Sequence, residues 1–229
     1  MGKAIENILL QRGHDLAGII TTKSNASDLS RLLASSDIAI EFSSPKAAPK
    51  NISSCLEAKV PVVCGTTGWM EHWQSVVNEV GNRQGALLYS SNFSVGVQLF
   101  FALNRSLARL MSSRSEYTCE LTEIHHTQKL DKPSGTAITL ANDVIQIHPN
   151  YQKWKLDHPD GQSLPIHSIR EGEVIGTHHI RYYSNIDEIF IEHKAFSREG
   201  FASGAVLAAE WLLGRHGVFS MQDVLDIRS

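Results

Sequence analysis

Short apolar runs alternate with helix-like segments through the first half of the chain. The runs lack strict apolar–polar alternation, which is typical of strands that are covered on both faces. Strands that alternate with helices form right-handed βαβ units, and successive units build a parallel sheet. The expected strands are Leu16–Thr21, Ile38–Phe42, Val60–Cys64 and Ala86–Tyr89, and the expected helices are Lys3–Arg12, Ala47–Ala58 and Trp69–Asn82.

The second half has a different pattern. Residues alternate over Tyr117–Ile124, and a helix is expected at Thr136–Ile147 before a Pro/Asp/Gly-rich connector near His158–Gly161. Strands separated only by turns favour an antiparallel or mixed sheet, and therefore a second domain. The expected later elements are strands Ile166–Arg170, Thr177–Tyr183 and Glu188–His193 and a final alanine-rich helix at Phe201–Leu213. The predicted class is α/β, with a parallel-sheet domain and a mixed-sheet domain.

The chain opens directly on a helix-like segment. A doubly wound nucleotide-binding domain begins with a strand, a glycine-rich turn and then a helix. One interpretation is that Met1 and Gly2 lie inside that turn and that the first strand is absent. Its neighbours would then lose backbone partners, at about 1–3 kcal/mol for each buried unpaired group. The other interpretation is a protein that begins with a surface helix, and the pattern alone does not separate the two.

Composition narrows the function classes. Over 229 residues the formal net charge is -3 and both signs are scattered, so no basic face indicates nucleic-acid binding. No apolar run approaches the ~20 residues that a bilayer requires. Cys55, Cys64 and Cys119 form no CxxC pair, which argues against a disulfide framework or a zinc site and favours a reducing compartment. We therefore expect a cytoplasmic α/β protein.

Groups capable of proton transfer and anion binding gather within about a dozen residues. His125 and His126 follow the alternating strand, and Lys129 and Asp131 lie in the loop after it. Histidine exchanges protons near neutral pH, and lysine donates a proton or binds a carboxylate. Residues 133–136, reading PSGT, then begin a helix, whose free N–H groups form an anion site. The combination suits a small dicarboxylate that must be protonated.

Each feature alone has a plainer explanation. Adjacent histidines on a loop are more often solvated than catalytic, and the PSGT start is an ordinary helix cap in most proteins. Metal binding is disfavoured because successive strand residues point to opposite faces and no third ligand follows at helical spacing. We therefore predict no metal site. The chemical interpretation depends on the combination of these features.

The segment Glu120–Ala137 closely resembles the signature of the 4-hydroxy-tetrahydrodipicolinate reductase family. Leu121 is a mild departure from it. The residues in register with the signature are Glu120, Glu123, His125, Lys129, Asp131 and Pro133 to Ala137. Further segments similar to the family are Glu41–Pro45, Gly65–Gly68, Ser90–Val97, Arg170–Gly172, Gly176–His178, Arg198–Phe201 and Gly204–Ala205.

The resemblance implies a fold and a reaction. It implies a Rossmann-like dinucleotide domain of residues 1–93 and 200–229, and a substrate and oligomerisation domain of residues 94–199 that builds a homotetramer. The reaction is hydride transfer from NADPH or NADH to a cyclic imine that carries two carboxylates. His125 is the implied acid/base group and Lys129 the proton donor. The implied substrate-binding residues are His126, Ser134, Gly135 and Thr136.

The cofactor-binding half is less complete. Of the family's glycine-rich turn only Met1 and Gly2 are present, and no acidic residue follows the expected second strand. Lys23 stands there instead, which favours NADPH weakly, since an exposed turn lysine is at least as good an explanation. The turn at Gly65, Thr66 and Thr67 is either a nicotinamide contact or a plain helix cap. The full cofactor-binding set is Met1, Gly2, Lys23, Phe42, Gly65, Thr66, Thr67, Ser90, Ser91, Asn92 and Phe93.

Two other functions remain open from the sequence. One is a different nicotinamide enzyme on the same scaffold, acting on another imine or an aldehyde. The other is a non-catalytic oligomerising or ligand-binding protein whose nucleotide site is lost with the first strand. Binding of nucleotide and of a dicarboxylate distinguishes them.

Overall fold

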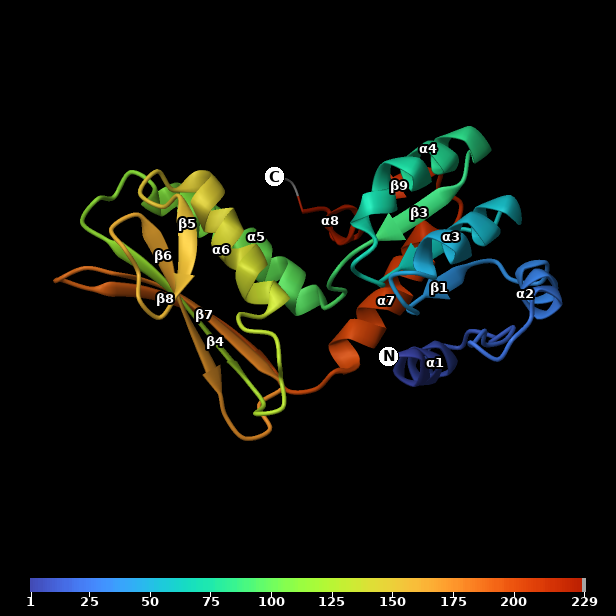
Figure 1. Cartoon of the computed structure of the whole chain (residues 1–229), viewed down its shortest axis with the longest axis horizontal. Helices are drawn as coiled ribbons and strands as arrows, with labels where there is room; N and C mark the ends of the chain where they lie inside the picture. The colour runs from blue at the N-terminus through green and yellow to red at the C-terminus, as the bar shows by residue number, and fades with distance from the viewer. Residues whose placement is uncertain (228–229) are drawn as a thin grey trace. The chain divides into compact units, whose positions relative to one another are not determined.

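The structure, a computed structural model, describes residues 1–227, apart from the side chain of Ala26. It divides into two compact units (Figure 1). Within the described residues, the first unit is Met1–Val95 together with residues 199–227, and the second unit is Gly96–Arg198. Among the described residues, no helix has the length and apolar character needed to cross a bilayer.

The first unit is built on a four-stranded parallel sheet in the order β1-β2-β3-β9. Its strands are β1 (Ala39–Glu41), β2 (Val62–Cys64), β3 (Ala86–Tyr89) and β9 (Gly217–Phe219). Its helices are α1 (Gly2–Gln11), α2 (Ala26–Leu33), α3 (Ala48–Glu57), the 3-10 turn η1 (Met70–His72), α4 (Trp73–Arg83), α7 (Glu199–Leu212) and α8 (Met221–Val224).

Both faces of this sheet are buried, as the continuous apolar runs predict. Val63 points into a core formed with α1, α7 and α8, whereas its neighbours Val62 and Cys64 point into a core formed with α3 and α4. Successive strand residues point to opposite faces, so a strand covered on both faces must be apolar at every position. The α/β class and the parallel sheet are confirmed.

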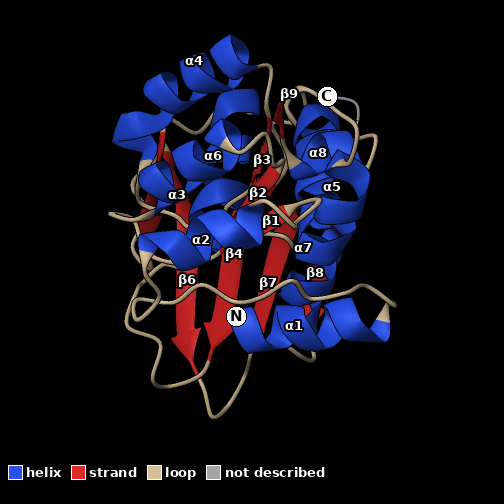
Figure 2. Ribbon diagram, turned by 90° about the vertical axis from the view of Figure 1, so that its right-hand side faces the viewer, coloured by secondary structure: helices blue, strands red, loops and turns tan. Residues whose placement is uncertain are grey.

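The second unit pairs five strands in the order β5-β6-β4-β7-β8, with both parallel and antiparallel neighbours. Strands β4, β6 and β7 lie side by side in Figure 2. One face packs against the helices in a single core. The strands are β4 (Thr118–His125), β5 (Lys153–Leu156), β6 (Ser163–Arg170), β7 (Gly176–Tyr183) and β8 (Glu188–Ala195), and the helices are α5 (Val95–Met111) and α6 (Gly135–Ile147). The predicted mixed sheet is confirmed.

The predicted strand at Leu16–Thr21 is wrong. This segment has no regular secondary structure, and its apolar side chains Leu16, Ile19 and Ile20 are 37–53% exposed. A strand needs a neighbour for its backbone hydrogen bonds. In a doubly wound sheet the neighbour of this strand is the one ahead of the first helix, and no strand precedes α1 within residues 1–227.

Candidate active site

The inner face of β4 changes from apolar to polar along the strand. Cys119 and Leu121 are buried in the core of the second unit, and Glu123 and His125 follow on the same face. Because side chains two residues apart share a face of a sheet, the strand carries the acid and the imidazole to one place. Glu123 is fully buried and His125 is 7% exposed.

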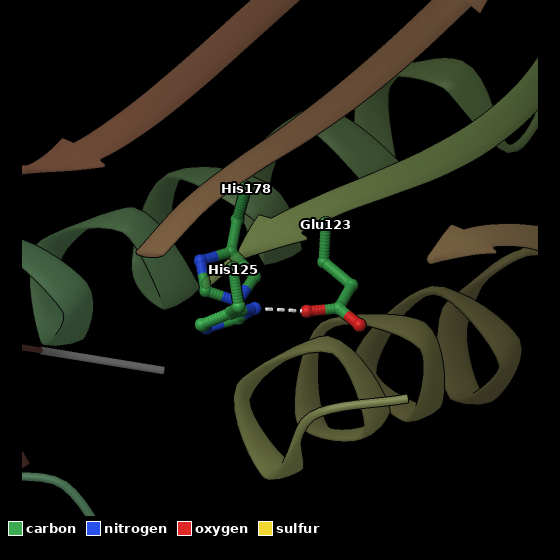
Figure 3. Close-up of side chains that lie close together, drawn as sticks. All are labelled: Glu123, His125 and His178. Carbon is green, nitrogen blue, oxygen red and sulfur yellow. Dashed lines mark hydrogen bonds and ion pairs between the residues drawn. The ribbon is translucent and has the colours of Figure 1, made fainter. Parts of the chain in front are cut away.

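Neighbouring strands complete a polar row beside these two residues. Glu123 lies opposite Ser168 of β6 and His178 of β7, and His125 lies opposite Arg170 of β6. Figure 3 shows Glu123, His125 and His178 converging from β4 and β7. The rings of His125 and His178 meet edge to face with their centroids 5.2 Å apart. The cluster therefore depends on strand register rather than on sequence proximity.

The Glu123 carboxylate is held on both oxygens. One oxygen accepts a hydrogen bond from His125 Nδ1, and the other accepts from Ser168 Oγ and, at 2.9 Å, from Arg170 Nη1. Burial alone would raise the pKa of Glu123, but the hydrogen bonds from His125, Ser168 and Arg170 outweigh burial and lower it. The carboxylate therefore stays ionised although it is buried.

His178 is held neutral next to this pair. It is 4% exposed, and loss of solvation, followed by repulsion from His125, lowers its pKa to about 3. Its Nε2 lies 3.2 Å from Ser134 Oγ. Because Ser134 Oγ already accepts a bond from Ala137 N, its hydroxyl proton is available to His178 Nε2. The proton of the neutral ring then sits on Nδ1, which has no hydrogen-bond partner in the described chain.

Buried neutral His178 predicts a loss of stability in acid. Between pH about 6.5 and about 3 the unfolded chain binds a proton at this histidine that the folded chain does not, so stability falls as pH falls through that window. We expect the melting temperature of His178→Gln to fall less between pH 7 and pH 5 than that of the wild type. His158→Gln, at an exposed histidine, is the control, and its melting temperature should fall as much as that of the wild type. Parallel curves for wild type and His178→Gln would contradict this assignment.

The loop after β4 presents the lysine. Lys129 Nζ lies 2.8 Å from Asp131 Oδ1, and the lysine side chain is 22% exposed. Partial burial would raise the pKa of Asp131, but the hydrogen bond and charge of Lys129 outweigh it and lower that pKa. His126 is half-buried in the same loop, and its carbonyl accepts from Lys129 N at 3.1 Å. The Lys129 ammonium is therefore paired with the Asp131 carboxylate, which is more than half exposed.

The first turn of α6 lies next to this loop in the chain. Ser134 caps the helix by accepting from Ala137 N at 3.2 Å, so the structure confirms its capping role. Gly135 is exposed, and a Cβ added there would meet nothing within 4 Å. Thr136 is half-buried. No contact with the described residues requires a glycine at position 135, whereas an anion at the helix start would use the open backbone there.

Glu123, His125 and His178 also meet the spacing of a metal site, since each places a ligand atom within 4.8 Å of the others. His178 lies on the neighbouring strand and reaches this cluster by strand pairing, which a search at helical spacing cannot detect. Two contacts oppose a cation. His125 Nδ1 is already bonded to Glu123, and the Arg170 guanidinium lies 2.9 Å from the other carboxylate oxygen. The absence of a metal remains a prediction.

In the first unit, expected cofactor residues gather where the parallel strands end. Phe42 follows β1, Gly65 follows β2, and Ser90 to Phe93 follow β3. The carboxyl ends of parallel strands form the usual ligand edge of such a sheet, so the placement fits a dinucleotide. The rings of Phe42 and Phe93 lie 5.6 Å apart. A Cβ at Gly65 would lie 2.2 Å from the Phe42 ring, so packing alone already requires this glycine.

The same edge is joined by side-chain hydrogen bonds. Thr66 Oγ1 accepts from Ser43 N at 2.8 Å, and Thr66 O accepts from the indole of buried Trp69 at 2.7 Å. Neither threonine of the turn caps the following helices, whose N-caps are Trp69 and His72 without side-chain cap bonds. The capping alternative for this turn is therefore wrong. Thr66 instead connects the loops that follow β1 and β2.

The remaining expected cofactor residues are spread more widely. Ser90 is buried, and its hydroxyl donates to Asn92 O at 2.7 Å, which shapes the turn after β3. Lys23 lies exposed in the turn before α2, which does not directly follow a strand in the chain. The other exposed members of the set are Met1, Gly2, Thr67 and Ser91. The structure thus brings Phe42, Gly65 and Phe93 together, whereas Lys23 lies outside the segments that directly follow the strands.

Comparisons with known proteins cover nearly the whole chain. A family model described as "Dihydrodipicolinate reductase, N-terminus" matches residues 1–93, and one described as "Dihydrodipicolinate reductase, C-terminus" matches residues 96–225. A 4-hydroxy-tetrahydrodipicolinate reductase of Christiangramia forsetii is 45% identical over 98% of this chain and 93% of its own length. One from Neisseria meningitidis serogroup B is 32% identical over 93% of this chain and 81% of its own length.

A solved structure shares the fold. Dihydrodipicolinate reductase from Paenisporosarcina sp. TG-14, with dipicolinate bound, superposes with a TM-score of 0.75 at 20% identity, covering 97% of this chain and 94% of that one. At this identity the likeness concerns the fold alone. The family models and the relatives carry the assignment: the chain belongs to the dihydrodipicolinate reductase family.

Proposed function

We propose that this protein catalyses the NAD(P)H-dependent reduction of 4-hydroxy-tetrahydrodipicolinate to tetrahydrodipicolinate in lysine and diaminopimelate biosynthesis. Its family membership supports the reaction. The observation that carries the proposal to the chemistry is the buried Glu123–His125 pair, which lies on the strand leading into the Lys129 loop and the capped start of α6. A proton-transfer group, a cation and an anion site are thereby supplied by one continuous segment.

In this reaction the reduced nicotinamide, when bound, supplies a hydride, and the protein must supply a proton. We assign His125 as the acid/base group, because its imidazole is fixed by an ionised carboxylate at the end of β4. Lys129 is the proton donor to the developing negative charge. Its ammonium rests on Asp131, which a substrate carboxylate can replace without loss of charge pairing.

Substrate binding is assigned to the helix start and the loop before it. Gly135 and Thr136 receive one carboxylate at the free N–H groups of α6, with Ser134 holding the turn. His126 holds the substrate from the loop. The bound dipicolinate of the Paenisporosarcina relative supports a small planar dicarboxylate as the ligand class.

Gly135→Ala tests this anion site without disturbing the fold. A Cβ at this position meets no protein atom within 4 Å, so the melting temperature should hold or rise slightly. The methyl group would obstruct a bound carboxylate at a cost of about 1–3 kcal/mol, which weakens binding of pyridine-2,6-dicarboxylate about 5–150-fold. Gly161→Ala, with equally open space in the same unit, is the control. Equal affinity in both variants would place the carboxylate elsewhere.

The first unit is assigned the dinucleotide, with Phe42, Gly65, Thr66 and the Ser90–Phe93 turn at the carboxyl edge of its sheet. Met1, Gly2, Thr67 and Lys23 complete the proposed set. Lys23 lies in the exposed turn before α2, where a cation would pair with a 2′-phosphate, so we favour NADPH as the cofactor. We expect kcat/KM to be higher with NADPH than with NADH and Lys23→Ala to reduce the difference. A marked preference for NADH would contradict the role of Lys23.

We assign residues 1–93 and 200–229 to the dinucleotide domain and residues 94–199 to the substrate and oligomerisation domain.

The outer face of the second sheet supports a homotetramer. On this face Arg181 pairs with Glu120 and Glu188, and Phe190 is 49% exposed beside His179. The helices of the second unit pack in the core on the opposite face. Sedimentation velocity should give the mass of four chains.

The three buried, unpaired cysteines support a cytoplasmic location.

Calorimetry with NADPH, NADH and pyridine-2,6-dicarboxylate tests the proposal against its alternatives. A reductase of this family should bind a reduced nucleotide and the dicarboxylate, with affinities that depend on different residues. Binding of the dicarboxylate without either nucleotide would instead favour a non-catalytic ligand-binding protein. Nucleotide binding without dicarboxylate binding would favour a nicotinamide enzyme with another substrate.

A further inference from the structure

We propose that Arg170 and Glu123 are positioning residues that hold His125 and Lys129 in a fixed spatial relation. The roles of His125 and Lys129 rest on the proposed function. The link runs through one guanidinium, which contacts the carboxylate behind the imidazole and the backbone of the loop that carries the lysine.

The first step of the link is the bond between Glu123 and His125. An ionised carboxylate is an acceptor only, so His125 Nδ1 must be the donor. The carboxylate therefore fixes the ring orientation and keeps a proton on Nδ1. Nε2 is left as the nitrogen that exchanges a proton with a ligand. Gly176 of β7 leaves room for this edge of the ring, because a Cβ there would lie 3.1 Å from His125 Nε2.

The second step is the pair of hydrogen bonds to the other carboxylate oxygen of Glu123. Arg170 Nη1 lies 2.9 Å from this oxygen, and Ser168 Oγ also donates to it. Both residues lie on β6, which is paired in parallel with β4 at this point. With three donors from two strands, the fully buried carboxylate has one orientation.

The third step joins the loop. Arg170 Nη2 donates to Asp131 O at 2.6 Å, and Arg170 Nε donates to Lys129 O at 3.3 Å. A guanidinium is planar and rigid, so donors on its different edges fix the positions of their acceptors relative to one another. The loop carbonyls and the Glu123 carboxylate are thereby held by a single group. The imidazole and the ammonium are thus connected through Arg170.

A simpler role for Arg170 is neutralisation of a buried acid. A lysine at this position would also neutralise Glu123, but its compact ammonium cannot reproduce the planar set of contacts to the carboxylate and both loop carbonyls. Arg170→Lys therefore separates the two roles. Neutralisation predicts near-normal turnover in this variant, whereas positioning predicts a loss.

The first experiment uses Glu123→Gln, which keeps size and removes charge. We expect kcat to fall about 10–100-fold, as is common for groups that orient a reacting imidazole, with little change in nucleotide affinity. Asp143→Asn is the matched control: it breaks the Arg105–Asp143 pair of the same unit, at 3.2 Å and 16% exposure on both sides, and should change stability but not kcat.

The second experiment compares Arg170→Lys with the double variant Glu123→Gln/Arg170→Lys. If both act through one link, the loss in the double variant should be much smaller than the product of the single losses. Affinity for pyridine-2,6-dicarboxylate should fall in Arg170→Lys because the Lys129 loop loses its anchor. Multiplicative losses, or near-normal kcat in Arg170→Lys, would overturn the proposal.

A readout independent of turnover keeps the two proposals distinguishable. Nitrogen-15 NMR of the wild-type protein should show His125 protonated on Nδ1 in its neutral form, and Glu123→Gln should weaken this preference. A protein with this tautomer but no reductase activity would contradict the proposed function and not the link. A wild-type His125 protonated on Nε2 would overturn the link even in an active enzyme, and it remains decisive if a variant fails to fold.

Discussion

His125→Gln should lower kcat by about 10²–10⁴-fold, the usual contribution of a general acid or base. Glutamine has nearly the reach of histidine and can still donate to the Glu123 carboxylate, so the buried acid keeps a partner. It cannot exchange a proton near neutral pH. Affinities for NADPH and for pyridine-2,6-dicarboxylate should therefore change little, and the loss should fall on kcat.

The control for this variant is His158→Gln. His158 is exposed in the connector of the same unit and lies outside the cluster, so its replacement should leave kcat unchanged. Steady-state kinetics across pH measures both variants. A His125→Gln enzyme with turnover close to that of the wild type would remove His125 from the chemistry and make Lys129 the sole candidate in the segment.

Lys129→Gln should lower kcat/KM by about 10²–10³-fold, because a positioned cation that meets developing negative charge has an effect of this size. In contrast to His125→Gln, the loss should divide between kcat and substrate KM. The ammonium that donates the proton also attracts a carboxylate, as its contact with Asp131 illustrates. Nucleotide affinity should be unaffected.

Lys132→Gln is the matched control, since this lysine is exposed three residues farther along the same loop. It removes the same charge from the same loop, so a general electrostatic effect on a dicarboxylate would appear in both variants. Single-turnover and steady-state rates with saturating nucleotide distinguish the two. Equal losses would show that the loop acts through its net charge rather than through Lys129.

The residue pattern predicted those helices and strands that are determined by their own local sequence. β1, β2 and β3 were found from continuous apolar runs, because both faces of these strands are buried. Helix α2 was missed although its signal is present: Asn25 and Asp28 form a capping box. Helix α5 was missed, since no helix was predicted between Tyr89 and Tyr117. The predicted strand at Leu16–Thr21 is absent for a different reason, because a strand forms only beside a neighbouring strand and not from local preference alone.

The candidate site shows the same division. His125, Lys129 and Ser134 could be found because they lie in one short segment with recognisable chemistry. Their partners could not, because Ser168 and Arg170 follow Glu123 by 45 and 47 residues and meet it only through the register of β4 and β6. The one available signal was the alternation of β4, which places Glu123 on the same face as His125. Glu123 also lies in the family signature, but its residue type and position alone indicate no role for it.

The most direct measurement of the central claim is turnover of the purified chain with 4-hydroxy-tetrahydrodipicolinate. We predict oxidation of NADPH or NADH in one-to-one stoichiometry with tetrahydrodipicolinate formed, competitive inhibition by pyridine-2,6-dicarboxylate, and loss of the rate in His125→Gln. A folded chain that binds the dicarboxylate but oxidises neither nucleotide in the presence of this substrate would contradict the assignment of the protein as a reductase.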